Sequence, residues 1–282
     1  YAAAFLAADL GMDVTLVDLE VNPGGVCLFL GCIPSKSLLH VAKILSESRE
    51  AKELGIEFAA PKIDINKVRS WKNSVVTRLT GGLGQLCKQR KIKFVQGRAT
   101  FLNSTSVKVQ KTDGTETQIF FTHAILATGS IPVNLPFAPA SPRILDSTTA
   151  LNLDDIPSKF LVVGGGYIGL ELGTVYAELG SKVTVVEMLP NLLMGADRDL
   201  AVILENRIKT HFAAIKVSTR VTKMEETAAG IKVTFEDKAG QISTEEFNKV
   251  LVAIGRKPNS RNLGLENTKV TVTERGFVAV NA

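Results

Sequence analysis

The sequence predicts an α/β protein of two domains, each with a sheet between helices in a three-layer architecture, with small β-meanders attached. Three observations support this. Apolar strand patterns alternate with helical patterns, one strand runs directly into a glycine-rich turn and a helix, and a segment of the first half recurs in the second. At roughly 100–200 residues per domain, a chain of 282 residues also favours two domains.

The first half is expected to open with a helix, a strand and a glycine-rich segment over residues 1–27. The elements that follow are helices at about 34–54 and 64–90, short strands at about 92–97 and 105–121, and an apolar strand at 123–130. A turn at Thr112-Asp113-Gly114 divides the 105–121 segment. The proline-rich residues 131–142 are typical of a linker between domains.

The second half begins near residue 151. Its expected elements are a strand before the glycines at 164–166, a helix to about 180, a strand at 182–187, a helix at about 197–211 and strands to about 254. The tail, RGFVAVNA, is predicted to be a strand that returns to the first domain. We therefore predict a first domain at 1–150, a second at 151–268 and a return segment at 269–282.

An internal repeat relates the two halves. Residues 10–18, LGMDVTLVD, match residues 179–187, LGSKVTVVE, at a fixed offset of 169. In the second copy a strand and a glycine loop precede the helix, and subtracting the offset places the equivalent of Gly169 immediately before Tyr1. We therefore expect an N-terminally truncated chain that lacks the first strand and glycine loop of its first domain.

The composition is that of an ordinary soluble globular protein, with 45% hydrophobic and 22% charged residues. The net charge of +5 is scattered, and its densest run, residues 88–93, favours a solvated helix end, so nucleic acid is not an expected partner. A modest positive field favours anionic ligands such as dinucleotides. No uninterrupted apolar stretch reaches the roughly 18 residues of a membrane span, so no membrane contact is expected.

The glycines of the second half have the G-x-G-x-x-G spacing of a Rossmann-like dinucleotide-binding turn. Gly164 permits the tight turn, Gly166 lets the backbone approach a pyrophosphate, and Gly169 lets the helix pack on the strand. The helix N-terminus then presents N–H groups to the phosphates. Glu187 ends the next strand, at the spacing expected of an acid that binds a ribose. Because a carboxylate repels a 2′-phosphate, we predict NAD(H) over NADP(H).

Two cysteines, Cys27 and Cys32, lie five positions apart. Five residues of straight helix rise about 7.5 Å, whereas a disulfide requires Cα atoms within about 7 Å. Cys27 is therefore expected before the helix or in a distorted first turn, with Gly24, Gly25 and Gly31 supplying backbone freedom. The spacing alone leaves open a redox-active pair, supported by the reactivity of thiols at helix starts, and two unrelated buried thiols. Zinc is not expected, because no second Cys/His pair with ligand spacing lies nearby.

Residues 24–36, GGVCLFLGCIPSK, resemble the signature of the flavin-dependent disulfide oxidoreductases. The resemblance implies two Rossmann-like domains, for FAD and NAD. It also implies that Cys27 exchanges with a dithiol substrate and that Cys32 lies against the flavin. Lys36 is implied to lie near the flavin and to pair with a glutamate on the NAD helix, here Glu171.

Within these enzymes, known as the class I pyridine nucleotide-disulfide oxidoreductases, the chain resembles the dihydrolipoamide dehydrogenases. Residues 33–36 (IPSK), 38–43 (LLHVAK), 79–83 (LTGGL), 127–130 (ATGS) and 253–259 (AIGRKPN) carry this likeness. The sequence departs from the family at Val26, where Thr is common, and at Phe29, where Asn is usual. Phe29 removes a polar side chain beside the cysteine pair.

The resemblance also implies cofactor contacts elsewhere. Asp18 takes the position of the acid that binds the adenosine ribose of FAD, and Tyr167 is either a cover for the flavin face or a plain first residue of a helix. The other implied cofactor-binding residues are Gly24, Gly25, Ala99, Thr128, Gly129 and Ser130 for FAD, and Val221 and Gly255 for NAD.

The implied reaction oxidises dihydrolipoamide, carried on a lipoyl domain, and passes electrons through the cysteine pair and FAD to NAD⁺. The implied complete protein is a cytoplasmic, bacterial-like homodimer bound to a 2-oxoacid dehydrogenase complex core. Its C-terminal dimerisation domain, which carries the catalytic base, is absent here, so we expect this segment alone to bind FAD poorly and not to turn over lipoamide. The alternatives are a mercuric or glutathione reductase-like enzyme and a redox-inactive scaffold.

Overall fold

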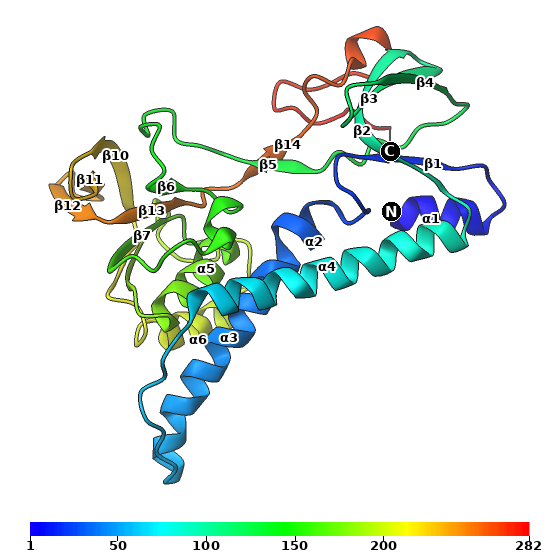
Figure 1. Cartoon of the computed structure of the whole chain (residues 1–282). Helices are drawn as coiled ribbons and strands as arrows, with labels where there is room; N and C mark the ends of the chain where they lie inside the picture. Colours follow the sequence, from blue (N-terminus) through cyan, green and yellow to red (C-terminus); the bar gives the residue numbers. More distant parts are fainter. Residues whose placement is uncertain (282) are drawn as a thin grey trace. The chain divides into compact units, whose positions relative to one another are not determined.

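The computed structural model describes residues 1–281, and the chain forms two compact units (Figure 1). The first unit consists of Tyr1–Phe29, Ser74–Ile131 and the chain from Lys257 onward, and the second consists of Leu30–Asn73 and Pro132–Arg256. The chain passes between the units four times, within α2 (Gly25–Leu30), α4 (Ile65–Gln89), β5 (Ser130–Pro132) and β14 (Arg256–Pro258). The assignment of 1–150 and 151–268 to two cofactors remains a prediction.

The first unit is built on a four-stranded sheet in the order β1-β2-β3-β4. Its strands are β1 (Thr15–Asp18), β2 (Lys93–Asn103), β3 (Ser106–Lys111) and β4 (Glu116–Phe120), and α1 (Ala2–Asp9) precedes them. β1 pairs with β2 in parallel, whereas β2, β3 and β4 form an antiparallel meander. Gly114 has a φ of 82° and accommodates the turn predicted between β3 and β4. The predicted strand at 92–97 is longer than expected, because its pairing with β3 continues to Asn103.

Two strand predictions in this unit are wrong. Residues 123–130 form no strand except at Ser130, where β5 (Ser130–Pro132) begins and pairs with β14 (Arg256–Pro258). A strand needs a ladder partner for its backbone, and within residues 1–281 no strand lies beside 123–129, so Ile125 is 70% exposed. In the 269–282 segment the described residues form an isolated bridge between Val272 and Val278 in place of a strand, and Ala282 lies outside the described residues.

The second unit contains a five-stranded sheet in the order β6-β13-β7-β8-β9, parallel throughout. The strands are β6 (Ile144–Leu145), β7 (Lys159–Val163), β8 (Lys182–Val186), β9 (Ala214–Lys216) and β13 (Lys249–Val252). The helices are α3 (Cys32–Glu50), continued by the 3₁₀ turn η1 (Ala51–Leu54), then α5 (Tyr167–Glu178), α6 (Arg198–Ile208) and the short turn η2 (Thr149–Asn152). The predicted α/β fold is confirmed.

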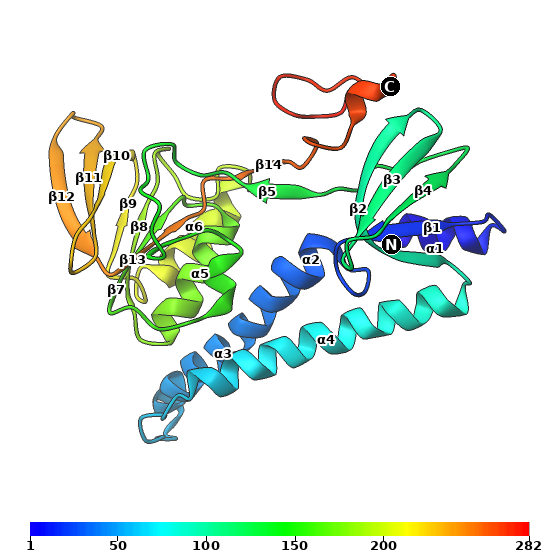
Figure 2. The same cartoon turned by 45° about the horizontal axis from the view of Figure 1, so that its top comes forward.

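Both faces of this sheet are covered, which gives three layers (Figure 2). Phe160 and Val162 of β7 pack with residues of α3 and α5. The alternate residues, Leu161 and Val163, pack with an antiparallel meander. That meander consists of β10 (Thr219–Glu226), β11 (Ile231–Asp237) and β12 (Ile242–Phe247). The near-continuous apolar run in β7 is therefore explained by a strand buried on both faces.

One stretch in the described part of the chain, Gly25–Leu54, is long and apolar enough to cross a membrane by length and composition alone. Its helix α3 buries Leu38, Ala42 and Leu45, of which Leu38 and Leu45 belong to the core of the second unit. Core helices of soluble proteins pass the same test. The stretch is therefore weak evidence for a membrane span.

Candidate functional site

The glycine-rich turn after β7 has the geometry that its sequence predicts. Gly164 has a φ of 112°, and a Cβ there would lie 2.4 Å from the carbonyl oxygen of Ala253. A Cβ at Gly169 would lie 2.2 Å from the carbonyl oxygen of Gly164. Both distances are far inside van der Waals contact, so only glycine fits at either position. The turn and the helix packing therefore depend on these two residues.

Gly166 differs from its two neighbours in the motif. It is the N-cap of α5, its backbone is extended, and a Cβ there would meet no heavy atom within 4 Å among the described residues. Among residues 1–281, no side chain caps the start of α5. The first N–H groups of the helix therefore remain directed at open space, where a phosphate is favoured by those donors and by the helix dipole.

The turn lies where the strand order of the parallel sheet reverses. β8 follows β7 on one side, and β13 lies on the other side of β7. Ala253 and Gly255 follow β13, and Ala253 reaches the turn at Gly164. Gly255 has a φ of 130° and accepts a hydrogen bond from the backbone of Val133. In open α/β sheets, ligands bind at this reversal point, beyond the carboxyl ends of the strands.

Glu187 follows β8 and its carboxylate is held by the backbone. One oxygen accepts from the N–H of Gly165 at 2.7 Å, and the other accepts from the N–H of Leu189 at 2.8 Å. The acid predicted to bind a ribose therefore lies against the glycine turn. Tyr167, the first residue of α5, is 65% exposed, while Val221 lies in β10 and packs against the meander core.

The two cysteines lie on separate helices. Cys27 is in α2, and Cys32 is the first residue of α3, with the break at Gly31, whose φ and ψ are −149° and −110°. The prediction that the pair cannot share one regular helix is confirmed. Both side chains are exposed, in contrast to Cys87, which is 2% exposed. The reading of Cys27 and Cys32 as two buried thiols is therefore wrong.

The glycines before Cys27 have different roles. Gly25 has a φ of 62° and opens α2. Gly24 is buried, and a Cβ there would lie 2.9 Å from the ring of Phe29. The aromatic residue that replaces the family's usual asparagine therefore packs on this glycine, where only a hydrogen leaves room for the ring.

Lys36 and Glu171 form the pair that the resemblance implies. The Lys36 ammonium donates to both carboxylate oxygens of Glu171, at 2.7 and 2.8 Å. Ser35, which the sequence analysis missed, donates to the same carboxylate at 3.3 Å and to the carbonyl of Cys32 at 3.1 Å. Lys36 follows Cys32 by one helical turn, so both lie on the same side of α3. The pair joins α3 to the helix that begins at the glycine turn.

The residues implied for FAD occupy the first unit. Asp18 ends β1 and accepts from the N–H of Glu20 at 3.1 Å, and Ala99 lies within β2. The carbonyls of Thr128 and Gly129 accept from the side-chain and backbone N–H groups of Asn259, at 3.1 and 3.0 Å.

Gly129 has a φ of 70°, and a Cβ there would lie 3.4 Å from Val26. Gly129 of the ATGS segment therefore lies close to Val26, which precedes Cys27. Ser130 begins β5. Asn259 was not predicted to be a site residue, although it belongs to the AIGRKPN segment that carries the family likeness.

Comparison with known proteins agrees with this arrangement. Residues 1–282 match the family described as pyridine nucleotide-disulphide oxidoreductase. The chain belongs to this family.

Several curated proteins are similar to this pyridine nucleotide-disulphide oxidoreductase over its whole length. The chain is 46% identical over 282 residues to the dihydrolipoyl dehydrogenases of Vibrio cholerae and Haemophilus influenzae, and 42% identical over 281 residues to that of Geobacillus stearothermophilus. Each match covers 100% of this chain but 59% of the relative. The chain therefore spans less than two thirds of the length of these relatives.

Two solved structures have a similar fold. LpdA of Mycobacterium tuberculosis has a TM-score of 0.87 at 26% identity, and the match covers 99% of this chain and 61% of that one. The HOCl-induced flavoprotein disulfide reductase RclA of Escherichia coli has a TM-score of 0.82 at 28% identity, covering 99% and 59%.

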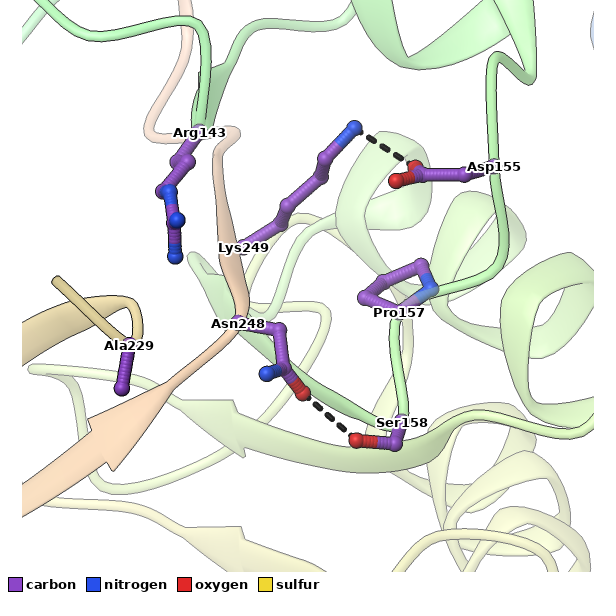
Figure 3. A pocket seen from close by; sticks show the side chains of 7 residues that line it. All are labelled: Arg143, Asp155, Pro157, Ser158, Ala229, Asn248 and Lys249. Atoms are coloured by element: carbon purple, nitrogen blue, oxygen red, sulfur yellow. Dashed lines mark hydrogen bonds and ion pairs between the residues drawn. The ribbon is translucent and has the colours of Figure 1, made fainter.

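The second unit of this pyridine nucleotide-disulphide oxidoreductase contains a cavity of about 420 Å³, and Figure 3 shows the side chains that line it. Its lining residues are Arg143, Asp155, Pro157, Ser158, Ala229, Asn248 and Lys249. Lys249 pairs with Asp155 at 2.6 Å, and Asn248 accepts from Ser158 at 2.7 Å. The cavity lies beside the starts of β7 and β13. It is therefore at the amino ends of the strands, whereas the glycine turn is at their carboxyl ends. None of the predicted site residues lines it.

Proposed function

We propose that the protein containing this chain is a dihydrolipoyl dehydrogenase, which oxidises dihydrolipoamide and reduces NAD⁺. One observation carries the proposal. Cys32 and Lys36 lie on the same side of α3, and Lys36 is bonded to Glu171, on the helix that begins at the dinucleotide turn. Cys32 and the dinucleotide turn are thus joined by a short chain of contacts within the second unit. The relatives named dihydrolipoyl dehydrogenase support the choice of substrate.

The residues of the second unit fit NAD. The open backbone at Gly166 and the uncapped start of α5 suit a pyrophosphate, and the Glu187 carboxylate suits ribose hydroxyls. Glu187 repels a 2′-phosphate and is followed by Met188, Leu189 and Pro190, none of which is basic. This favours NAD(H) over NADP(H).

In the first unit, Asp18 and the main chain around Gly129 fit part of an FAD site. The Asp18 carboxylate ends β1, as a ribose-binding acid does. When bound, the flavin would pass two electrons from the cysteine pair to the nicotinamide of NAD⁺. The chain itself binds and orients these groups and presents the two thiols.

The cysteines perform the thiol chemistry. A thiolate of dihydrolipoamide attacks the Cys27 sulfur of the oxidised pair, which forms a mixed disulfide and releases Cys32 as a thiolate. The second substrate thiolate then attacks the substrate's own sulfur in that mixed disulfide. The cyclic disulfide of lipoamide leaves, Cys27 takes up the electron pair, and the cysteine pair is reduced by two electrons.

The partners belong to the same proposal. The relatives' name implies a lipoyl substrate. On this basis the proposed partner is a 2-oxoacid dehydrogenase complex core. The proposed complete enzyme is a cytoplasmic homodimer. The name of RclA, a disulfide reductase, favours a second candidate, a flavoprotein that reduces another disulfide with NAD(P)H.

Substitution of each cysteine in the complete protein tests the function. Cys32→Ser should abolish dihydrolipoamide oxidation, because the pair can then no longer close, while NADH binding measured by fluorescence should be unchanged. Cys87→Ser is the matched control, since that thiol is buried and outside the proposed chemistry. Lipoamide turnover that survives Cys32→Ser would refute the proposal. Turnover of another disulfide, without lipoamide turnover in the wild type, would favour the second candidate.

A further inference from the structure

A buried carboxylate lies at the last residue of α5. The Glu178 side chain is 3% exposed, and its two oxygens have different partners. One accepts from the Arg49 guanidinium of α3, and the other lies 2.7 Å from Nδ1 of His211, just after α6. His211 was given no role from the sequence. Glu178 therefore connects α5 to both neighbouring helical segments of the second unit.

This arrangement is costly for stability alone. A carboxylate at the C-terminus of a helix opposes the helix dipole, and burying a carboxylate costs free energy that its half-exposed partner Arg49 offsets only in part. The consequence of Glu178 is therefore geometric. Its pairing with Arg49 fixes where the end of α3 lies on α5, and its contact with His211 holds the carboxylate against the segment after α6.

The same two helices carry the Lys36–Glu171 pair. Glu171 and Glu178 are seven residues apart, about two turns, so they lie on one face of α5. Ser35, bonded to Glu171, and Arg49, bonded to Glu178, are fourteen residues apart on α3, about four turns, and also share a face. Between these polar ends, buried residues of both helices belong to one apolar cluster. The α3–α5 contact is thus fixed by a charged bond at each end.

We propose that Glu178 is a positioning residue for the Lys36–Glu171 pair. Its pairing with Arg49 sets the register of α3 on α5, His211 holds the carboxylate in place, and this register brings the Lys36 ammonium to Glu171. The consequence for chemistry rests on the proposed function: Glu178 touches neither substrate nor cofactor, and acts on the redox segment through α3.

A zero-length cross-link measures the pair directly. A water-soluble carbodiimide condenses a lysine amine with a carboxylate in contact with it into an amide and takes up the water that is lost. Lys36 and Glu171 lie within 2.7 Å and are both solvent-accessible, so their cross-linked peptides can be quantified by mass spectrometry. Lys93 and Asp13 of the first unit, at 2.8 Å, serve as an internal reference. Arginine forms no such amide.

Glu178→Gln should lower the yield of the Lys36–Glu171 cross-link about fivefold, a size typical of coupling within one polar network. The Lys93–Asp13 yield should not change. Glu50→Gln is the matched control: Glu50 adjoins Arg49 on α3, but it is exposed and pairs with Arg207 of α6, so the Lys36–Glu171 yield should stay at the wild-type value.

Arg49→Met tests the same link without changing the buried carboxylate, in case Glu178→Gln unfolds the second unit. Circular dichroism establishes which variants are folded. A folded Glu178→Gln or Arg49→Met variant with a wild-type Lys36–Glu171 yield overturns the proposal.

Turnover in the complete protein separates this inference from the proposed function. Glu178→Gln should lower kcat for dihydrolipoamide about fivefold with KM unchanged, since the residue touches no substrate. A lowered cross-link yield with unchanged kcat would overturn the positioning role. Absence of lipoamide turnover in the wild type would refute the proposed function, while the cross-link result would still decide the structural claim.

Discussion

Alanine substitution at two glycines of one turn should separate folding from dinucleotide binding. A methyl group at Gly164 would lie 2.4 Å from the Ala253 carbonyl oxygen, on a backbone with a φ of 112°. Strained backbone of this kind costs about 1–3 kcal/mol, and displacing a packed neighbour costs about as much again. We expect Gly164→Ala to lower the free energy of unfolding by about 3 kcal/mol or more.

Gly166→Ala should do the opposite. Its φ is −80°, which alanine adopts readily, and the added Cβ has open space around it. Stability should change by less than about 1 kcal/mol, because the reduced freedom of the unfolded chain offsets the poorer N-cap that alanine makes. The methyl group would, however, occupy the place where a pyrophosphate must approach the backbone. Losing one charge-assisted hydrogen bond costs about 1.5–3 kcal/mol, so NADH affinity should fall by about tenfold or more.

Urea unfolding followed by circular dichroism gives the stability, and a fluorescence titration with NADH gives the affinity. The two variants are each other's control, since they differ by two positions in one turn. NADH affinity that survives Gly166→Ala would refute the assignment of the turn to the pyrophosphate. An undiminished unfolding free energy for Gly164→Ala would refute the steric argument.

Two further predictions concern single side chains. Glu187→Ala should narrow the preference for NADH over NADPH, measured as a ratio of affinities, because the carboxylate that repels a 2′-phosphate is gone; an unchanged ratio would contradict this. Burial, followed by the nearby Asp155 and Asp154 carboxylates, raises the pKa of Tyr176 well above its ordinary value. The unfolded chain therefore loses this proton above about pH 10 while the folded chain keeps it, so stability should fall there by up to about 1.4 kcal/mol per pH unit. Tyr176→Phe should flatten that alkaline slope in urea titrations, at a cost of about 1 kcal/mol for the lost bond to the Ala150 carbonyl; an equal slope in both proteins would show that Tyr176 is not its source.

The elements of the second unit follow from the sequence because local pattern and long-range packing agree there. An apolar run that ends in glycines is a strand buried on both faces, and β7 has meander and helices on its two sides. Residues 123–130 have the same apolar character but form no strand before Ser130. Strand formation depends on a neighbouring strand, and the sequence of the segment does not reveal whether one lies beside it.

The site residues divide in the same way. Gly164, Gly169 and Glu187 were predictable because their role is set by spacing along one strand–turn–helix unit. Lys36 and Glu171 were paired through the family resemblance, since no local pattern joins residues so far apart in the chain. The partners of Glu178 could not be predicted, because a histidine and an arginine on two other helical segments meet it only after folding.

The Glu187 carboxylate is bonded through both oxygens to the main chain before any ligand arrives. Its rotamers are consequently restricted during folding, when the glycine turn and the segment after β8 come together. Immobilising such a side chain at the moment of association would cost about 1 kcal/mol. Under the proposed function, a ribose would meet a carboxylate whose orientation is already fixed, and selectivity between the two nicotinamide dinucleotides would depend on a rigid group.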